Sequence, residues 1–308
     1  MADYVIVTPR SLSQAGHPYL QRLREEGYEL CFPAPGRQPT EEELLGVVGG
    51  GVAYLAGVEK INANILEKAH KLKVISRNGV GVDNIDLKTA ERLGIPVETA
   101  SGANARGVAE LAIALMLAVS RFVPQTHGTI KEGGWGRWMG REVQGKVLGL
   151  IGCGKIGRET ARMALGLGMN VMAYDPNPDF KFDPGKGFAF TSMENLLKEA
   201  DIVSLHCPPG NKPLLDRPAL YSMKRNAILI NTARAELIDA EAVHEALEKG
   251  RLFGLGTDVF SAEPPEPSPL IRHHRVVSTA HIGAFTEESV NRATVAAVDN
   301  IMKYLKKN

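Results

Sequence analysis

Residues 147–175 read VLGLIGCGKIGRETARMALGLGMNVMAYD. The apolar run 147–151 predicts a buried strand, a helix can follow the glycines, and a second apolar run, 171–174, ends at Asp175. Between the first strand and the helix lies the pattern G-x-G-x-x-G, at 152–157. The first glycine of this pattern permits a tight turn, the second lets the backbone approach a pyrophosphate, and the third lets the helix pack close to the strand. We therefore predict a dinucleotide-binding domain whose helix N-terminus binds the phosphates.

The context of the motif favours this interpretation over a glycine turn kept for packing alone. Asp175 follows the last glycine by 18 positions, close to the roughly 20 typical of a carboxylate that binds the ribose. Such a carboxylate accepts a hydrogen bond from a 2′-hydroxyl and repels a 2′-phosphate, and the next residues, PNP at 176–178, supply no arginine. The sequence thus predicts NAD in preference to NADP. The loop residues expected to bind it are Gly152, Gly154, Lys155, Ile156 and Gly157.

Composition excludes several other classes of function. The 308 residues suffice for about two domains, and 36 Lys plus Arg against 35 Asp plus Glu give a formal charge of +1. We expect no nucleic-acid partner and no membrane association, because no block of like charges stands out and the most apolar stretch, 108–119, is too short to span a bilayer. The N-terminus lacks a signal-peptide pattern, and Cys31, Cys153 and Cys207 lie far apart. We therefore predict a cytoplasmic protein with reduced thiols and no metal site.

Strand-like and helix-like runs alternate along the chain, which predicts an α/β fold with parallel sheets covered on both faces. Strands are expected at 4–7, 28–32, 52–55, 72–76, 95–98, 147–151, 171–174, 202–206, 227–231, 255–259 and 276–279. Helices are expected at 18–26, 62–69, 86–93, 104–121 and 286–306, with another opened by a capping box at 40–43. A glycine fingerprint normally follows the first strand of its domain, so the dinucleotide-binding domain begins near residue 100 and is inserted into another domain.

A nicotinamide cofactor implies hydride transfer, which needs a group that exchanges the hydroxyl proton and a cation that holds an anionic substrate. His281 follows the strand 276–279, at the carboxyl end where open α/β sheets bind ligands. Arg234 follows the strand 227–231 in the same way and suits a bidentate grip on a carboxylate. From the residues alone, a structural histidine, a surface arginine and a solvated carboxylate at Glu263 remain open alternatives.

Four motifs resemble, in their order, those of the D-isomer-specific 2-hydroxyacid dehydrogenases, and the resemblance covers nearly the whole chain. They are the glycine loop at 152–157, NTARAELID at 231–239, DVFSAEPP at 258–265 and TAHIGAFTEES at 279–289. The resemblance implies that Arg234 binds the carboxylate and carbonyl of the substrate and that His281 is the acid/base. It further implies that Glu263 hydrogen-bonds the other imidazole nitrogen and fixes the orientation of the ring.

The resemblance also implies a domain arrangement. Residues 1–100 plus 285–308 would form a flavodoxin-like substrate domain, and residues 101–284 an inserted Rossmann NAD-binding domain. The active site would lie in the cleft between them, and a homodimer would form through the NAD-binding domains. Asp258 would lie near the nicotinamide, and the further cofactor contacts implied are Cys207, Thr232, Ala233 and His281.

Within the family, SRNGVGVDNID at 76–86 and WMGREVQGK at 138–146 are similar to phosphoglycerate dehydrogenases. By that similarity the backbone N–H groups of Val80 and Gly81 hold the substrate carboxylate. Arg77 and Asn78 join this substrate site, with Arg77 and Arg137 as candidates for a distal phosphate and a solvated surface arginine as the alternative for each.

Two positions depart from the phosphoglycerate dehydrogenase pattern. YLAG at 54–57 lacks the basic residue common at the end of that strand, which weakens the phosphate assignment. Ala235 stands where a glycine usually follows the catalytic arginine, which puts the shape of that loop in question. We also expect no C-terminal regulatory extension.

We therefore predict an NAD-dependent oxidoreductase that transfers a hydride between nicotinamide and C2 of a D-2-hydroxy acid. The first choice of substrate pair is 3-phosphoglycerate and 3-phosphohydroxypyruvate. Glyoxylate, hydroxypyruvate or another acidic 2-hydroxy acid such as sulfolactate are the alternatives. The alternative of another class is a non-catalytic NAD-sensing module that resembles the corepressors of this family.

Overall fold

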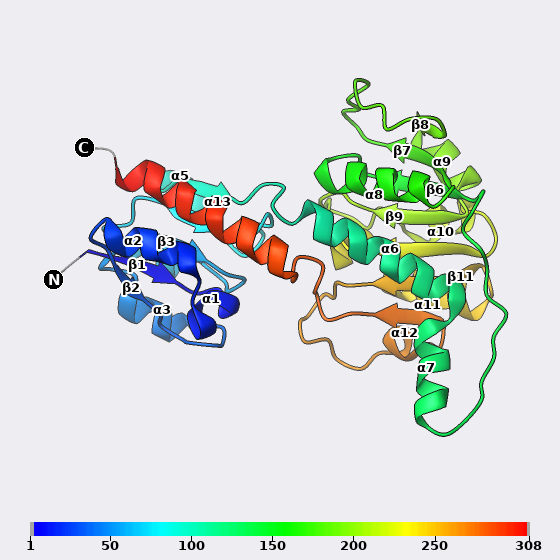
Figure 1. The fold of residues 1–308 in the computed structure, drawn as a ribbon, viewed down its shortest axis with the longest axis horizontal. Coiled ribbons are helices and arrows are strands. Elements are labelled where there is room, and N and C mark those ends of the chain that lie inside the picture. Colours follow the sequence, from blue (N-terminus) through cyan, green and yellow to red (C-terminus); the bar gives the residue numbers. More distant parts are fainter. Residues whose placement is uncertain (1–2, 307–308) are drawn as a thin grey trace. The chain divides into compact units, whose positions relative to one another are not determined.

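The computed structural model describes residues 3–306, which divide into two compact units. The first unit contains the chain up to Asn104 together with the chain from Thr286 onward, and the second is Ala105–Phe285 (Figure 1). Each unit has a parallel sheet with helices on both faces, so the predicted α/β class is confirmed.

The first unit contains a five-stranded sheet in the order β2-β1-β3-β4-β5. This is the flavodoxin-like order, whose switch point lies between β1 and β3. Its strands are β1 (Tyr4–Val7), β2 (Glu29–Cys31), β3 (Gly51–Ala56), β4 (Ile75–Arg77) and β5 (Val97–Thr99). Its helices are α1 (Arg10–Ala15), η1 (Pro18–Leu20), α2 (Gln21–Glu25), α3 (Glu41–Val47), α4 (Ala63–Glu67), α5 (Leu87–Arg92) and α13 (Glu287–Leu305).

The C-terminal helix α13 belongs to this first unit. Its residues Ala297, Val298 and Ile301 are fully buried and pack with Val5 and Leu55 of the sheet. The predicted capping box also forms, because the Thr40 side chain accepts from the Glu43 N–H while the Glu43 carboxylate accepts from the Thr40 N–H.

The second unit contains a seven-stranded sheet in the order β12-β11-β10-β9-β6-β7-β8. Counted from β6 as the first strand, this is the Rossmann order 3-2-1-4-5-6 with one added strand, and the order reverses between β6 and β9. Its strands are β6 (Val147–Ile151), β7 (Asn170–Tyr174), β8 (Phe188–Phe190), β9 (Ile202–Leu205), β10 (Ala227–Asn231), β11 (Leu252–Thr257) and β12 (Val276–Ser278). Its helices are α6 (Ala105–Arg121), α7 (Val123–Lys131), α8 (Lys155–Gly166), α9 (Met193–Glu199), α10 (Arg217–Ser222), η2 (Ala235–Leu237), α11 (Ala240–Glu248) and α12 (Pro269–Arg272).

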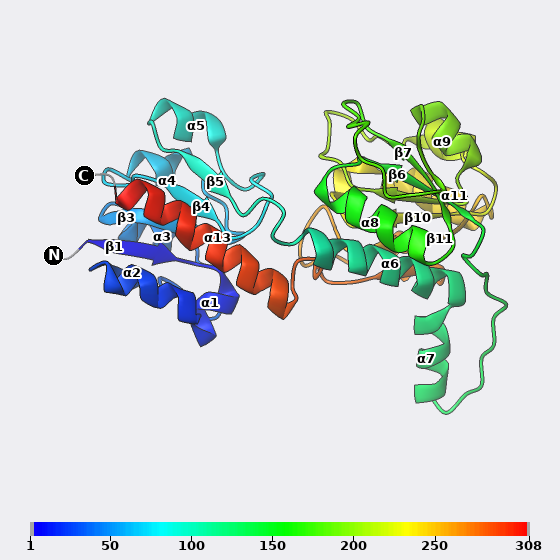
Figure 2. The same cartoon turned by 45° about the horizontal axis from the view of Figure 1, so that its top comes forward.

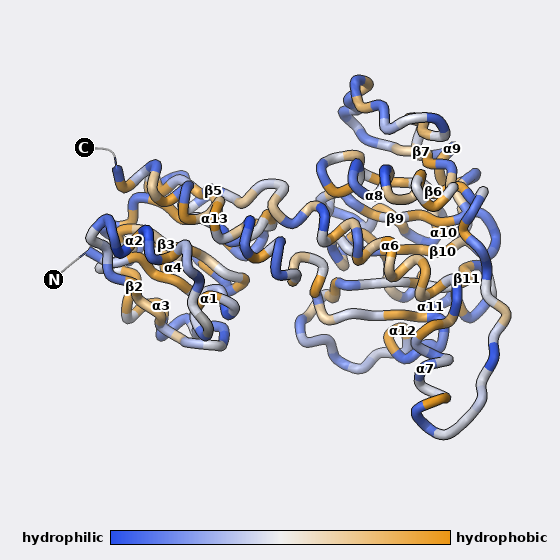
Figure 3. Tube along the Cα trace, in the orientation of Figure 1, coloured by the Kyte–Doolittle hydropathy of each residue, from blue (hydrophilic) through white to orange (hydrophobic). Residues whose placement is uncertain are grey.

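Two apolar clusters cover the faces of this second sheet. Helices α6 and α8 lie side by side on one face (Figure 2), where Leu115, Met116 and Ala161 are buried against the strands. Helices α9, α10 and α11 cover the other face. The apolar stretches follow the strands of each unit, and the helices alternate apolar and hydrophilic residues (Figure 3).

Some elements differ from the prediction. The strand expected at 72–76 is Ile75–Arg77, and the strand expected at 255–259 is Leu252–Thr257. An apolar run indicates which residues are buried, but not which of them pair with a neighbouring strand. Helices α1, α7, α9, α10 and α12, the 3-10 helix η2 and the short strand β8 were not predicted. Helix α7 buries none of its residues, and its apolar side chains Val123 and Ile130 are too few to show a helical period.

Within residues 3–306, no single helix has the length and apolar character needed to cross a membrane. Helices α6 and α7 together reach that length, but their axes bend by 66° where they meet.

Candidate active site

The three glycines of the 152–157 loop occupy three different environments. Gly152 has φ +98°, and a Cβ placed on it would lie 2.5 Å from the His206 carbonyl oxygen. A Cβ on Gly157 would lie 2.2 Å from the Gly152 carbonyl oxygen. At Gly154 a Cβ would meet no atom within 4 Å. The outer two glycines therefore allow close backbone contacts that a side chain would block. The middle one leaves its backbone groups open to an approaching phosphate, as a bound dinucleotide requires.

Asp175 directly follows β7, beside this loop. Its Oδ2 accepts a hydrogen bond from the Cys153 N–H (2.8 Å), and its Oδ1 accepts from the Asn177 N–H (2.9 Å). The carboxylate is therefore fixed against the glycine loop at the position predicted for ribose recognition. Lys155 and Ile156 begin α8, so their N–H groups lie in its first turn, and Gly154 is the N-cap.

The neighbouring strands β9 and β10 bring further predicted cofactor contacts to the carboxyl edge of the sheet. Cys207 follows β9, and its N–H lies 2.9 Å from the point where a Gly152 Cβ would sit. Thr232 and Ala233 follow β10, and the buried hydroxyl of Thr232 has no hydrogen-bond partner within residues 3–306. A buried hydroxyl without a partner at this edge fits a site that a polar ligand completes.

His206 directly follows β9, and its burial makes the stability of the fold depend on pH. Its Nε2 hydrogen-bonds the Ser204 hydroxyl (2.9 Å), and burial lowers its pKa from 6.5 to about 4. Between these two values the unfolded chain binds more protons than the folded one, so the free energy of unfolding falls as the pH drops from 6.5 to 4.

We expect this fall to reach about 3 kcal/mol for the single imidazole. Urea unfolding of the wild type and of His206→Gln across pH 4–7 measures it, and the variant should lose that part of the pH dependence. Parallel curves for the two proteins would contradict the assignment to His206.

Arg234 lies just past β10, and the loop around it is held by Asn231. The Asn231 side chain donates to the Arg234 carbonyl (2.8 Å) and accepts from the Ala233 N–H (3.1 Å). The Arg234 guanidinium is half-buried, and its Nη1 donates to the Ala233 carbonyl (2.7 Å). Ala235 begins the 3-10 helix η2, and the backbone there is not left-handed, so the missing glycine leaves the loop unstrained.

His281 and Glu263 form the predicted pair. The two carboxylate oxygens of Glu263 lie 2.9 and 2.8 Å from His281 Nδ1. Because the carboxylate accepts from Nδ1, the other nitrogen, Nε2, is the one left to exchange a proton. His281 also has φ +52°, a left-handed backbone conformation that is uncommon outside glycine and is found at functional sites.

Asp258 holds the loop that carries His281. Its buried carboxylate accepts from the Thr279 hydroxyl (2.6 Å), the Ile282 N–H (2.9 Å) and the Gly283 N–H (2.8 Å). Its own N–H donates to the Asn231 carbonyl (3.0 Å), which links it to the loop of Arg234. Asp258 thus fixes the loops that follow β10 and β12, and its contact with nicotinamide stays a prediction.

The register of the sheet brings the catalytic candidates to one edge. Asn231 pairs with Thr257, and Thr257 pairs with Ser278, so the ends of β10, β11 and β12 are level. Arg234 and His281 each lie three residues beyond these ends, on the two sides of β11. The second unit therefore collects the glycine loop, Arg234, Glu263 and His281 at the carboxyl edge of a single sheet.

Four further residues predicted to bind the substrate lie in the first unit, at the carboxyl edge of its sheet: Arg77, Asn78, Val80 and Gly81. Arg77 is the last residue of β4, and its Nη1 donates to the Asn78 carbonyl (2.7 Å). The Asn78 N–H donates to the Ala56 carbonyl at the end of β3 (2.9 Å). Val80 is 39% exposed and Gly81 is half-buried. These residues are close in sequence and share one edge of their sheet.

An acidic residue that the sequence did not predict lies at the same edge. Glu59 is buried, and its Oε1 accepts from the Tyr54 hydroxyl (2.9 Å), from the Gly57 N–H (3.0 Å) and from the Thr8 hydroxyl. The end of β3 therefore carries a carboxylate held by neutral donors in place of the basic side chain expected of a phosphate site. Its neighbours come from β1 and β3, a long-range contact that no local pattern displays.

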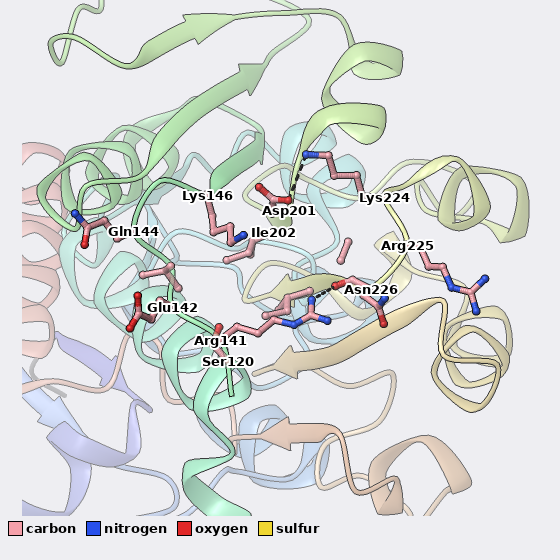
Figure 4. Close-up of a pocket in the computed structure, with 13 residues that line it drawn as sticks. Ser120, Arg141, Glu142, Gln144, Lys146, Asp201, Ile202, Lys224, Arg225 and Asn226 are labelled. Carbon is pink, nitrogen blue, oxygen red and sulfur yellow. Dashed lines mark hydrogen bonds and ion pairs between the residues drawn. The ribbon is translucent and has the colours of Figure 1, made fainter. Parts of the chain in front are cut away.

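A hollow in the second unit lies at the opposite, amino edge of its sheet. It measures about 510 Å³ and is bordered by Arg141, Lys146, Asp201, Lys224 and Asn226 (Figure 4). Lys224 pairs with Asp201 (3.2 Å), and Arg141 donates to the Asn226 carbonyl (2.8 Å). None of the predicted site residues borders it, and the amino edge is not where open α/β sheets bind their ligands.

Comparison with known proteins assigns the second unit to a family. Residues 113–283 match the family described as "D-isomer specific 2-hydroxyacid dehydrogenase, NAD binding domain". The D-3-phosphoglycerate dehydrogenase of Methanocaldococcus jannaschii is 40% identical over 273 residues, which cover 87% of this chain and 52% of that protein. The chain thus spans about half the length of this relative.

Two further similarities extend over most of both partners. The hydroxypyruvate reductase of Thermotoga maritima is 38% identical over 273 residues, covering 86% of this chain and 88% of that protein. The crystal structure of the TT0316 protein from Thermus thermophilus is 39% identical with a TM-score of 0.89, covering 98% of this chain and 97% of that one.

Proposed function

Because the chain belongs to the D-isomer-specific 2-hydroxyacid dehydrogenases, whose NAD-binding domain it contains, we propose that it oxidises or reduces a D-2-hydroxy acid with NAD as cofactor. The observation that carries this proposal is the pair between His281 Nδ1 and Glu263, placed at the same sheet edge as the glycine loop. A non-catalytic NAD-binding module would have no need of an acid/base pair at this edge.

Arg234, His281 and Glu263 have different roles in this reaction. When bound, the nicotinamide supplies or accepts the hydride. Arg234 binds the carboxylate and carbonyl oxygens of the acid and so fixes the reacting carbon. His281 Nε2 gives a proton to the carbonyl oxygen during reduction and takes it from the hydroxyl during oxidation. Glu263 holds the ring in the orientation that leaves Nε2 for this task.

For the substrate, the loop at 76–86 supports 3-phosphoglycerate as the first candidate, because Arg77, the candidate for the distal phosphate, is the last residue of β4. The buried carboxylate of Glu59, held by neutral donors at the end of β3, favours hydroxypyruvate or glyoxylate as the second. A second negative charge on the substrate would be repelled by a carboxylate at this position whose described partners are all neutral.

The test is a nicotinamide-absorbance assay with 3-phosphohydroxypyruvate, hydroxypyruvate and glyoxylate. We expect turnover of at least one acid, and Arg234→Lys should lower its kcat/KM by about 10- to 100-fold, since the bidentate charge-assisted contact is lost. Arg225→Lys, an exposed arginine at the amino edge, is the matched control. Unchanged kcat/KM in Arg234→Lys would contradict the role of Arg234.

The same measurement decides between an enzyme and an NAD-sensing module. Tight NADH binding without turnover of any 2-hydroxy or 2-keto acid would favour the module and reject the dehydrogenase.

We also propose a homodimer through the second unit, and the exposed apolar side chains of α7 and the loop after it support this proposal. These are Val123, Ile130, Trp135 and Met139.

A further inference from the structure

A second polar contact holds the glycine loop opposite Asp175, and it comes from Arg158 on helix α8. Its Nε donates to the Cys153 carbonyl (3.2 Å), while the Cys153 N–H donates to Asp175. Arg158 and Asp175 therefore bind the two backbone groups of one residue. A guanidinium thus lies next to the carboxylate that the proposed function assigns to the ribose.

Asp179 holds this guanidinium by its other end. Arg158 Nη2 donates to Asp179 Oδ2 (3.0 Å), and the guanidinium carbon lies 5.0 Å from the centre of the Phe182 ring. Asp179 is itself fixed by its own turn, because its Oδ1 accepts from the Lys181 N–H (3.1 Å) and its carbonyl accepts from the Phe182 N–H (2.9 Å). The loop after β7 therefore brings a positioned carboxylate to Arg158.

The charges of this group decide which dinucleotide it tolerates. An arginine near the ribose-binding carboxylate is the residue type that accommodates a 2′-phosphate. Here Asp175, Arg158 and Asp179 sum to one negative charge, and the guanidinium is engaged on both sides. Without Asp175 and Asp179, this group would carry one positive charge, and the Arg158 guanidinium could bind a phosphate through two N–H groups.

We propose that Asp179 is a second determinant of NAD preference, acting by pairing with Arg158 and keeping its guanidinium from a 2′-phosphate. This inference rests on the proposed binding of NAD at the glycine loop. It assigns cofactor choice to three charged residues and not to Asp175 alone. Arg158 is accordingly a latent NADP-binding residue.

The test is calorimetric titration of the full chain with NADH and NADPH, which reads binding and not turnover. We expect Asp175→Ser to weaken NADH binding, and the double variant Asp175→Ser/Asp179→Asn to bind NADPH about 10-fold or more tighter than Asp175→Ser, as expected for one charge-assisted contact. Adding Arg158→Gln, which keeps a donor for the Cys153 carbonyl but removes the charge, should abolish that gain.

Asp183→Asn in the Asp175→Ser background is the matched control. Asp183 is an exposed carboxylate of the same loop that accepts only from the Gly185 N–H (3.0 Å) among the contacts described for it. Equal NADPH affinity with and without Arg158→Gln, or an equal gain from Asp183→Asn, would overturn the proposal. Arg158→Ala in the same double variant supplies a second removal of the charge, and a gain that survives both substitutions also overturns it.

Titration of the wild type distinguishes a failure of the proposed function from a failure of this inference. If the wild type binds neither NADH nor NADPH, the proposed function is wrong. If it binds NADH and the removal of Asp179 brings no Arg158-dependent gain in NADPH affinity, the proposed function stands and this inference is wrong.

Discussion

His281→Ala should lower kcat by about 10²- to 10⁴-fold, the range that a positioned general acid/base contributes. The side chain is 47% exposed and touches Glu263 through Nδ1, so its removal leaves no buried charge and no cavity in either core. We therefore expect the variant to unfold at nearly the wild-type temperature. Steady-state assays on the best acid from the substrate test, together with thermal unfolding, measure both properties.

Glu263→Gln separates the orientation of the ring from the proton exchange. The amide can still contact Nδ1, but it no longer fixes which nitrogen carries the proton, so we expect a smaller loss of kcat than in His281→Ala. The double variant should lose no more than His281→Ala alone, because residues that act as one unit are not additive. His70→Ala, an exposed histidine of the first unit, is the control. Wild-type kcat in His281→Ala would reject the assignment of the acid/base.

The features that sequence did predict are those carried by local spacing. The glycine pattern, the acidic residue after it and the apolar strands lie within one continuous stretch, so period and spacing were enough to identify the unit. The Glu263–His281 pair came from resemblance to a family, because residues 18 apart in a loop-rich region display no pattern of their own. The structure then identified Nδ1 as the ring nitrogen of His281 that contacts Glu263.

The features that sequence did not predict are contacts with backbone groups and with distant loops. Asp258 was expected at the nicotinamide, and the structure shows that its carboxylate holds the N–H groups of Ile282 and Gly283. Backbone donors are present at nearly every residue, so a sequence gives no sign of which carboxylate they bind. Arg158 and Asp179 were missed for a related reason, since their pairing depends on the path of the loop after β7.

Alanine substitutions at two glycines of the loop should impair different properties, stability at Gly157 and NADH binding at Gly154. In Gly157→Ala the new Cβ would lie 2.2 Å from the Gly152 carbonyl oxygen, so strand and helix must separate. We expect this overpacking to lower the free energy of unfolding by about 1–3 kcal/mol. In Gly154→Ala the new Cβ meets no atom of the protein within 4 Å. The free energy of unfolding should then change by less than about 1 kcal/mol, the scale of a helix N-cap.

The same open space that makes Gly154→Ala harmless to the fold makes it harmful to the ligand. A methyl group there would occupy the approach of the pyrophosphate to the backbone N–H groups, so NADH affinity should fall by about 10-fold or more, as expected when charge-assisted hydrogen bonds are lost. Urea unfolding and NADH titration of both variants check this. If Gly154→Ala bound NADH like the wild type, the phosphates would not pass over this residue. The glycines of the loop would then serve packing alone. The three different environments of Gly152, Gly154 and Gly157 argue against that alternative.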